Sequence, residues 1–162
     1  MTQRILFLDI DGVLCTTRAS LAHGEYGLSR YMDTVAIEFL NRLHEAAPYS
    51  IVVTSTWRNE VDCTILLPAV GILAPLAHPE WRTGIHHSGP SSFHDRPREI
   101  DGWLSKHGSG VDYLILDDSM FSWTDDQHAR WVKCDSQDGI SFQAMNEAFA
   151  LFGADWPQVK RA

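Results

Sequence analysis

Three short apolar segments of this chain are each followed at once by side chains that can take part in catalysis. These side chains are two pairs of carboxylates and one hydroxyl group: Asp9 with Asp11, Asp117 with Asp118, and Ser55. Segments that are brief and apolar on both faces are typical of buried parallel strands. In an open parallel sheet, ligands bind beyond the carboxyl ends of the strands. If the three strands are neighbours, these side chains therefore meet at one site.

Four carboxylates gathered in one place repel one another and therefore need a cation. Ligation by oxygen alone selects a hard ion, and Mg²⁺ fits best when water and a phosphate supply the other oxygens. Such a site suits phosphoryl transfer, which needs a nucleophile, an acid for the leaving oxygen and neutralisation of the phosphoryl charge. Asp9 and Asp11 would point to opposite faces of a straight strand, so we expect the chain to turn at Gly12.

The rest of the sequence supplies the elements that position this site. Apolar runs predict buried strands over residues 5–8, 51–53 and 113–116, and an edge strand over 131–134. Apolar periodicity predicts helices over 34–46, 58–68 and 98–107, and a last helix that begins after Ser141. Residues 15–32 are interpreted as a loop or small flap, and residues 77–95 as an irregular loop. The alternation of strand and helix predicts one three-layer α/β domain over residues 1–162, with a mostly parallel sheet.

The order of these motifs resembles the haloacid dehalogenase (HAD) superfamily over nearly the whole chain. Asp9-Ile10-Asp11-Gly12-Val13-Leu14 is similar to its first motif, and Ser55 at the end of an apolar strand to its second. Arg96, or alternatively Arg98, opens a helix as in the third motif, where Lys is commoner. The paired acids Asp117-Asp118 resemble the fourth motif. The resemblance implies a Rossmann-like HAD fold. A large cap domain is not expected, because neither the segment between Asp9 and Ser55 nor the segment between Ser55 and Arg96 is long enough to hold one.

What the resemblance implies can be stated residue by residue. Asp9 would be the nucleophile and a Mg²⁺ ligand. Asp11 would protonate the leaving group and then activate the water that hydrolyses the aspartyl-phosphate, while its backbone carbonyl binds the metal. Arg96 would balance the charge of the intermediate. Asp118 would bind Mg²⁺ directly. Asp117 would either be a further ligand or lie next to the ligands without touching the metal. Since dehalogenases of the superfamily lack the second aspartate, Asp11 favours phosphate esters.

The second motif also suggests how substrate is held. Ser55 would hydrogen-bond a phosphoryl oxygen, with Thr54 as the alternative if the register is shifted by one residue. The predicted substrate contacts are Gly12, Thr54, Thr56, Trp57, Arg58 and Arg98. An indole beside a guanidinium could stack a base, so Trp57 and Arg58 are either a base-binding pair or a core and a surface residue.

Histidines of the 77–95 segment invite a second metal interpretation. These are His86, His87 and His94. They lack a defined ligand spacing and nearby cysteines, so solvated histidines explain them better.

The bulk composition narrows the class of protein. The chain has 162 residues, 44% of them hydrophobic, which suffices for the core of one domain. A net charge of -8 argues against tight binding to long nucleic acid. Three cysteines without metal-ligand spacing, Cys15, Cys63 and Cys134, favour reduced thiols. There is no signal-peptide layout and no apolar run near the ~20 residues that cross a bilayer, so we expect a cytoplasmic protein without a membrane partner.

These features predict a Mg²⁺-dependent phosphohydrolase that acts on phosphate monoesters. The stretch Thr54-Ser55-Thr56-Trp57-Arg58 resembles HAD domains of nucleic-acid end-repair proteins, and open, capless sites suit polymer ends. Small nucleotides and nucleic-acid terminal phosphates are therefore the expected substrates. A phosphotransferase or phosphomutase would use the same residues. A non-catalytic binding module would keep the fold but usually lose Asp9 or Asp11, and both are present.

Overall fold

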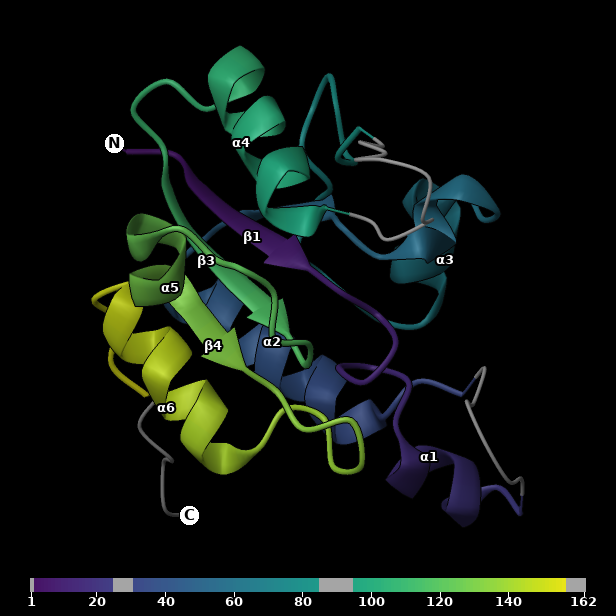
Figure 1. Ribbon diagram of the computed structural model, residues 1–162. Helices are drawn as coiled ribbons and strands as arrows, with labels where there is room; N and C mark the ends of the chain where they lie inside the picture. Colours follow the sequence, from purple (N-terminus) through teal and green to yellow (C-terminus); the bar gives the residue numbers. More distant parts are fainter. Residues whose placement is uncertain (1, 25–30, 85–94, 157–162) are drawn as a thin grey trace.

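A parallel β-sheet forms the centre of the molecule (Figure 1). The computed structural model describes residues 2–24, 31–84 and 95–156. Within them the strands lie in the order β2-β1-β3-β4, and every neighbouring pair is parallel. Their bounds are β1 Arg4–Leu8, β2 Ser50–Val53, β3 Asp112–Asp117 and β4 Trp131–Lys133. The predicted α/β fold with a parallel sheet is confirmed.

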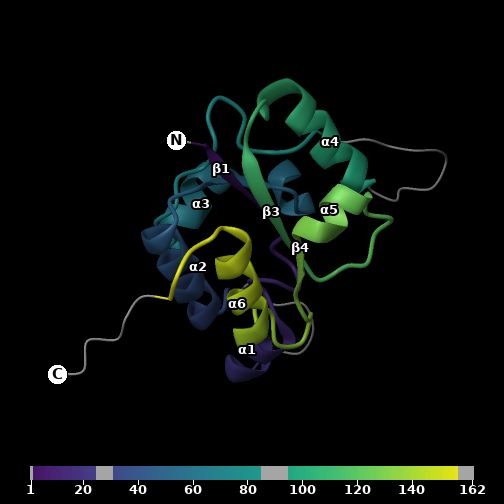
Figure 2. The same cartoon turned by 90° about the vertical axis from the view of Figure 1, so that its left-hand side faces the viewer.

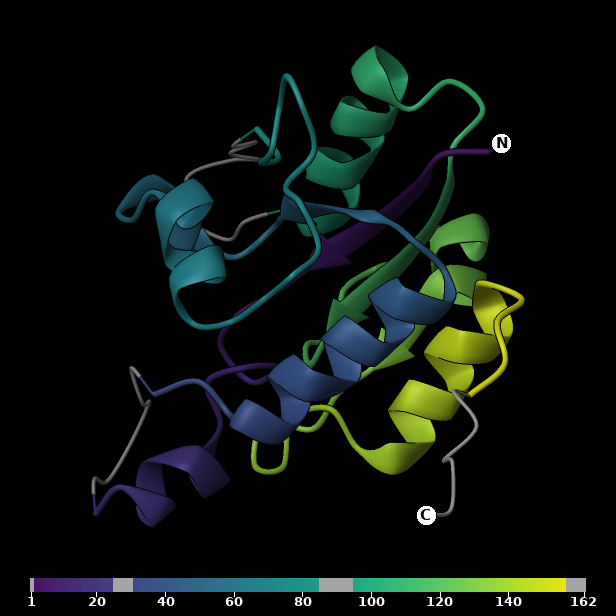
Figure 3. The ribbon, with the colours of Figure 1, turned by 180° about the vertical axis from the view of Figure 1, so that it is seen from behind.

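Helices cover both faces of this sheet. They are α1 Thr17–Ala22, α2 Thr34–Ala46, the 3₁₀ helix η1 Thr56–Asn59, α3 Cys63–Ala69, α4 Arg96–His107, α5 Asp125–Arg130 and α6 Phe142–Leu151. The side view and the view from behind place α4 and α5 on one side of the sheet, and α2 and α6 on the other (Figure 2, Figure 3). This is the three-layer arrangement that alternating strands and helices produce.

The core is divided by the alternation of side chains along the strands. Leu6 and Leu8 of β1 belong to a large apolar cluster on the face of α2 and α6. Phe7, between them, points to the opposite face and meets the ring of Trp103 from α4 edge-on, with ring centroids 5.5 Å apart. Because both faces are covered, the strands are apolar throughout and appear in the sequence as continuous runs.

The helix boundaries follow local capping signals. Asp33 begins α2, its carboxylate accepting a hydrogen bond from the Val35 N–H at 2.9 Å. The helix expected over 58–68 is instead two elements, η1 and α3, because Asp62 caps a new helix and accepts from the Thr64 N–H at 2.9 Å. The 15–32 segment, expected to be a loop or flap, contains the short helix α1, which Thr16 caps.

No separate cap domain interrupts the described part of the chain. The segment between Asp9 and Thr54 carries α1 and α2 besides β2, and residues 55–84 carry η1 and α3. The expectation of a minimal, capless member is therefore confirmed. Cys15, Cys63 and Cys134 are all buried and free of disulfides.

Two further expectations concern the rest of the sequence. His86, His87 and His94 lie outside the described residues. Across the described ranges, no helix combines the length and the apolar character that a bilayer crossing requires.

Candidate active site

The register of the sheet brings the ends of three strands level with one another. Leu8 is paired with Val53 of β2 and with Leu116 of β3. The ladder continues one residue further, since the Thr54 N–H donates to the Leu8 carbonyl and the Asp9 N–H donates to the Leu116 carbonyl, each at 3.0 Å. Asp9 therefore lies between Thr54 and Asp117, on the face that α4 covers, because side chains alternate along each strand.

Three carboxylates gather at this edge of the sheet. One oxygen each of Asp9, Asp117 and Asp118 lies within 4.8 Å of the others. Asp9 and Asp117 are buried, and backbone N–H groups hold both: Ile10 donates to Asp9 Oδ1 at 2.9 Å and Ser119 donates to Asp117 Oδ1 at 2.8 Å. Asp118 is half-buried. The predicted convergence of residues far apart in the sequence is thus present for these three aspartates.

Gly12 allows the loop after β1 to pass close to Asp118. Its φ of +75° lies in the left-handed region that glycine adopts readily. A Cβ at this position would come within 2.2 Å of Asp118 Oδ2, so a larger residue would displace that carboxylate. Gly12 therefore allows the turn that was predicted at this position, directly after the two aspartates of the first motif, and leaves room for the Asp118 carboxylate.

Arg96 supplies the positive charge of the site. Arg96 is the first residue of α4 and directly follows the N-cap residue Asp95. Its Nη1 lies 2.9 Å from Asp9 Oδ2 and 2.6 Å from Asp117 Oδ2. The ring of Phe121 covers the guanidinium, with its centroid 5.1 Å from Cζ. Arg98, the alternative, has a side chain that is 71% exposed and pairs with Asp95 at 3.2 Å. The structure therefore places Arg96, and not Arg98, in the site.

Burial and the repulsion between neighbouring carboxylates raise the pKa values of two acids of the site, Asp117 and Asp118. Burial, together with the Asp9 charge, raises the pKa of Asp117 to about 7 although the charge of Arg96 opposes the shift. Burial and the Asp9 charge likewise raise the pKa of Asp118. For Arg96, the charges of Asp9 and Asp117 outweigh the effect of burial and raise its pKa, so the guanidinium stays protonated.

This group of side chains fits a hard divalent cation. Among the described residues, the guanidinium of Arg96 contacts two of these three carboxylates, so negative charge remains for a cation to balance. All the side-chain donors are oxygens, and oxygen ligands favour Mg²⁺ over softer metals. The Asp11 side chain is not part of the cluster, so only its backbone carbonyl remains a predicted ligand.

Asp11 instead lies against the indole of Trp57. The Trp57 Nε1–H points between the two carboxylate oxygens, 3.0 Å from Oδ1 and 3.1 Å from Oδ2. Burial raises the pKa of Asp11, while this hydrogen bond acts in the opposite direction. The sequence could not indicate the contact, because the two residues are 46 positions apart and only the register of β1 with β2 brings them together.

The hydroxyl groups of the second motif differ in their surroundings. Ser55 caps η1, and its Oγ accepts from the Trp57 N–H at 3.4 Å. Thr54 Oγ1 is buried and has no hydrogen-bond partner among the described residues. Thr54 is also the residue level with Asp9, whereas Ser55 comes one position later. Thr56 is half-buried and begins η1.

Arg58 does not lie where substrate can touch it. Its side chain is fully buried and pairs with Glu99 of α4, the Nη2 to Oε2 distance being 3.0 Å. It also donates to backbone carbonyls of two segments: Thr54, Ser55, Thr83 and Gly84. The predicted substrate contact at Arg58 is therefore wrong, as is its alternative description as a surface residue. Arg58 joins the end of β2, residues 83–84 and α4, and Glu99 is the partner that the sequence did not reveal.

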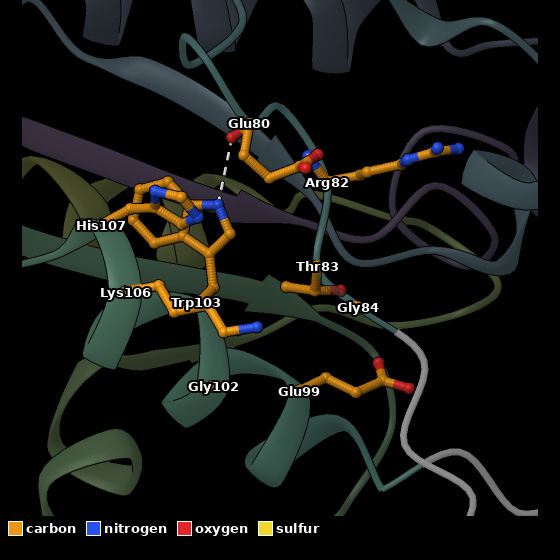
Figure 4. A pocket seen from close by; sticks show the side chains of 9 residues that line it. All are labelled: Glu80, Arg82, Thr83, Gly84, Glu99, Gly102, Trp103, Lys106 and His107. Carbon is orange, nitrogen blue, oxygen red and sulfur yellow. Dashed lines mark hydrogen bonds between the residues drawn. The ribbon is translucent and has the colours of Figure 1, made fainter.

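A cavity of about 380 Å³ lies beside this buried pair, between residues 80–84 and α4 (Figure 4). The lining residues are Glu80, Arg82, Thr83, Gly84, Glu99, Gly102, Trp103, Lys106 and His107. In Figure 4 the Trp103 indole N–H donates to the Glu80 carbonyl, a contact of 3.0 Å. None of the clustered aspartates lines the cavity, so it is separate from the site described above.

The comparisons with known proteins agree with this geometry. The family model described as the HAD domain in Swiss Army Knife RNA repair proteins matches residues 5–145. Neither the curated proteins nor the solved structures gave a match. The matched range begins in β1 and ends in α6, and it includes every residue of the aspartate cluster and Arg96. The chain therefore belongs to the HAD domains of Swiss Army Knife RNA repair proteins, a family of the phosphohydrolase type.

Proposed function

We propose that this protein is a Mg²⁺-dependent phosphatase that hydrolyses phosphate monoesters through a phosphoryl group carried on Asp9. The observation that carries the proposal is the grouping of Asp9, Asp117 and Asp118 within 4.8 Å, with Arg96 in contact with the first two. In such an arrangement, Asp9, Asp117 and Asp118 would hold a divalent cation next to the carboxylate nucleophile, and Arg96 would add a fixed positive charge. When bound, Mg²⁺ would neutralise charge on the phosphoryl oxygens and hold the phosphate in place.

The protein groups divide the reaction into two displacements at phosphorus. A carboxylate oxygen of Asp9 attacks, the bond to the leaving oxygen breaks, and Asp11 gives that oxygen a proton. Water then attacks the phosphoryl group on Asp9 while Asp11 takes a proton from it, which releases phosphate and restores both side chains. Arg96 stays charged throughout and balances the extra charge near Asp9.

Thr54 is the better candidate for the phosphoryl contact that was assigned to Ser55. Its hydroxyl is buried without a partner, and it is level with Asp9, while the Ser55 hydroxyl caps η1. Arg96 Nε is likewise buried and unpartnered within the described residues. Buried donors usually have an acceptor, and a bound phosphoryl group would supply acceptors for both.

For the substrate, we propose the terminal phosphate of an RNA strand or a small nucleotide. Support comes from the family description, which names RNA repair, and from the absence of a cap over the described site. The net charge of -8 favours a strand end over a long nucleic-acid tract, because extended binding needs basic surface.

The test is hydrolysis of p-nitrophenyl phosphate with and without Mg²⁺, by the unmodified protein and by Asp9→Asn. We expect turnover that needs Mg²⁺ and is lost in Asp9→Asn. The exposed Asp138 provides a control, since Asp138→Asn should keep full activity. Full activity of Asp9→Asn would disprove the nucleophile assignment. A panel of 3′- and 5′-phosphorylated oligoribonucleotides and mononucleotides then identifies the preferred substrate.

A further inference from the structure

The contact between Trp57 and Asp11 has a geometry suited to a catalytic acid and base. The indole N–H is shared between both carboxylate oxygens, at 3.0 and 3.1 Å. In the part of the chain that the structure describes, this is the side-chain hydrogen bond that the Asp11 carboxylate receives. A donor placed between the two oxygens holds the carboxylate group in position and leaves the other lone pairs of both oxygens available.

Trp57 is itself held in place by the end of β2. Its backbone N–H donates to Ser55 Oγ at 3.4 Å, and its carbonyl accepts from the N–H groups of Glu60 at 3.0 Å and Val61 at 2.8 Å. The next residue, Arg58, is fully buried and tied to three segments. The indole is half-buried and packs against the large apolar cluster. The donor is therefore fixed, whereas Asp11 lies in a loop that turns at Gly12.

We propose that Trp57 is a positioning residue that orients Asp11 for proton transfer in the reaction proposed above. As the phosphoryl group moves to Asp9, the bond to the leaving oxygen breaks and Asp11 passes its proton to that oxygen. The negative charge left on Asp11 spreads over both oxygens, and the indole N–H lies between them. In the second displacement Asp11 takes a proton from water and returns to its first state. Trp57 exchanges no proton and acts only through Asp11.

Trp57 and Arg58 do not act together as the base-stacking pair that was one of the two interpretations of the sequence. The guanidinium of Arg58 is fully buried and pairs with Glu99, and the N–H edge of the Trp57 indole is turned toward Asp11. This inference rests on the proposed function, since it assigns a role within that reaction.

The test replaces Trp57 with benzothienylalanine, which keeps the shape of the side chain but has sulfur in place of the N–H group. kcat/KM is measured for a series of aryl phosphates whose leaving groups range from acidic to basic. Proton donation matters most for basic leaving groups, and general acid catalysis contributes about 10²–10⁴-fold. We expect a loss of about tenfold for phenyl phosphate and less than about twofold for the most acidic leaving group, on that scale. Trp57→Phe should show the same trend.

The matched control is the same replacement at Trp103, whose N–H donates to a backbone carbonyl remote from the aspartates. It should leave the dependence on the leaving group unchanged. An equal loss for all substrates at Trp57, or no loss, would overturn the positioning role, because a merely structural defect does not distinguish leaving groups. Asp11→Asn should steepen the same dependence. If the unmodified protein hydrolyses none of the esters, the proposed function itself fails and the role of Trp57 with it.

Discussion

The buried pair of Arg58 and Glu99 should be the most sensitive point of the fold near the site. Both side chains are fully buried, so Arg58→Met would remove the guanidinium that pairs with the buried Glu99 carboxylate. Breaking a buried ion pair in this way costs about 3–5 kcal/mol of unfolding free energy. The substitution also removes the donor for the Thr54, Ser55 and Thr83 carbonyls, at about 1 kcal/mol for each hydrogen bond.

We therefore expect Arg58→Met to lower the unfolding free energy by about 5 kcal/mol or more. For a chain of this length, 1 kcal/mol corresponds to a shift of about 2–4 °C in Tm, so the expected fall is about 10–20 °C. Glu99→Gln should cost less, because Arg58 keeps its backbone acceptors. Urea denaturation followed by far-ultraviolet circular dichroism measures these differences.

The control is the exposed pair of Arg42 and Glu45, 2.8 Å apart with side chains 55% and 63% exposed. Arg42→Met should change the unfolding free energy by less than about 0.5 kcal/mol, since exposed pairs contribute little. An unfolding free energy of Arg58→Met within about 1 kcal/mol of that of the unmodified protein would show that the buried pair does not stabilise the fold as expected.

Three other predictions concern the site itself. Arg96→Met should lower kcat by about 10²–10³-fold, as the loss of one preorganised donor does in other enzymes. Arg98→Met, on the exposed side of the same helix, should keep kcat within about twofold of the unmodified protein. Equal values of kcat for the two variants in steady-state kinetics would contradict the assignment of Arg96 to the site. Gly12→Ala and Gly110→Ala both place alanine at a left-handed φ, +75° and +74°, but only Gly12→Ala brings a Cβ against Asp118. Both variants should lose about 1–2 kcal/mol of unfolding free energy. Only Gly12→Ala should also lose Mg²⁺ binding, which calorimetric titration measures. Burial raises the pKa of Asp117 from 3.8 to about 7, so the metal-free folded protein retains a proton that the unfolded chain gives up at lower pH. The unfolding free energy of the metal-free protein should therefore fall as the pH rises from about 4 to 7. Denaturation at a series of pH values in the presence of EDTA tests this prediction, and Asp117→Asn should reduce the fall in unfolding free energy. An unfolding free energy that rises over this pH range, equally in the unmodified protein and in Asp117→Asn, would contradict it.

The sequence was sufficient to predict the sheet and most of the carboxylate site. Strands β1, β2 and β3 are covered on both faces, so each appears as an apolar run, and the acids that follow them mark the carboxyl edge. Helix α5 was missed because it is short and has few apolar residues. Its one signal is the capping box between Thr124 and Gln127.

The side chains of η1 could not be assigned from sequence. In a 3₁₀ helix, successive residues point in directions about 120° apart, so either Trp57 or Arg58 could face the core. The choice depends on Glu99, which is 41 positions away from Arg58 in the chain. The choice between Thr54 and Ser55 likewise depends on which residue is level with Asp9, and that register is set by the pairing of β1 with β2.

Trapping the intermediate shows whether Asp9 carries the phosphoryl group. Asp11→Asn should slow the second displacement, because no carboxylate then takes a proton from the attacking water. We would incubate this variant with Mg²⁺ and substrate, quench with acid and map its peptides by mass spectrometry. We expect a phosphoryl group on Asp9, absent without Mg²⁺ and absent from Asp9→Asn. A phosphoryl group on another residue, or a protein that turns over substrate in a Mg²⁺-dependent reaction without ever modifying Asp9, would contradict it.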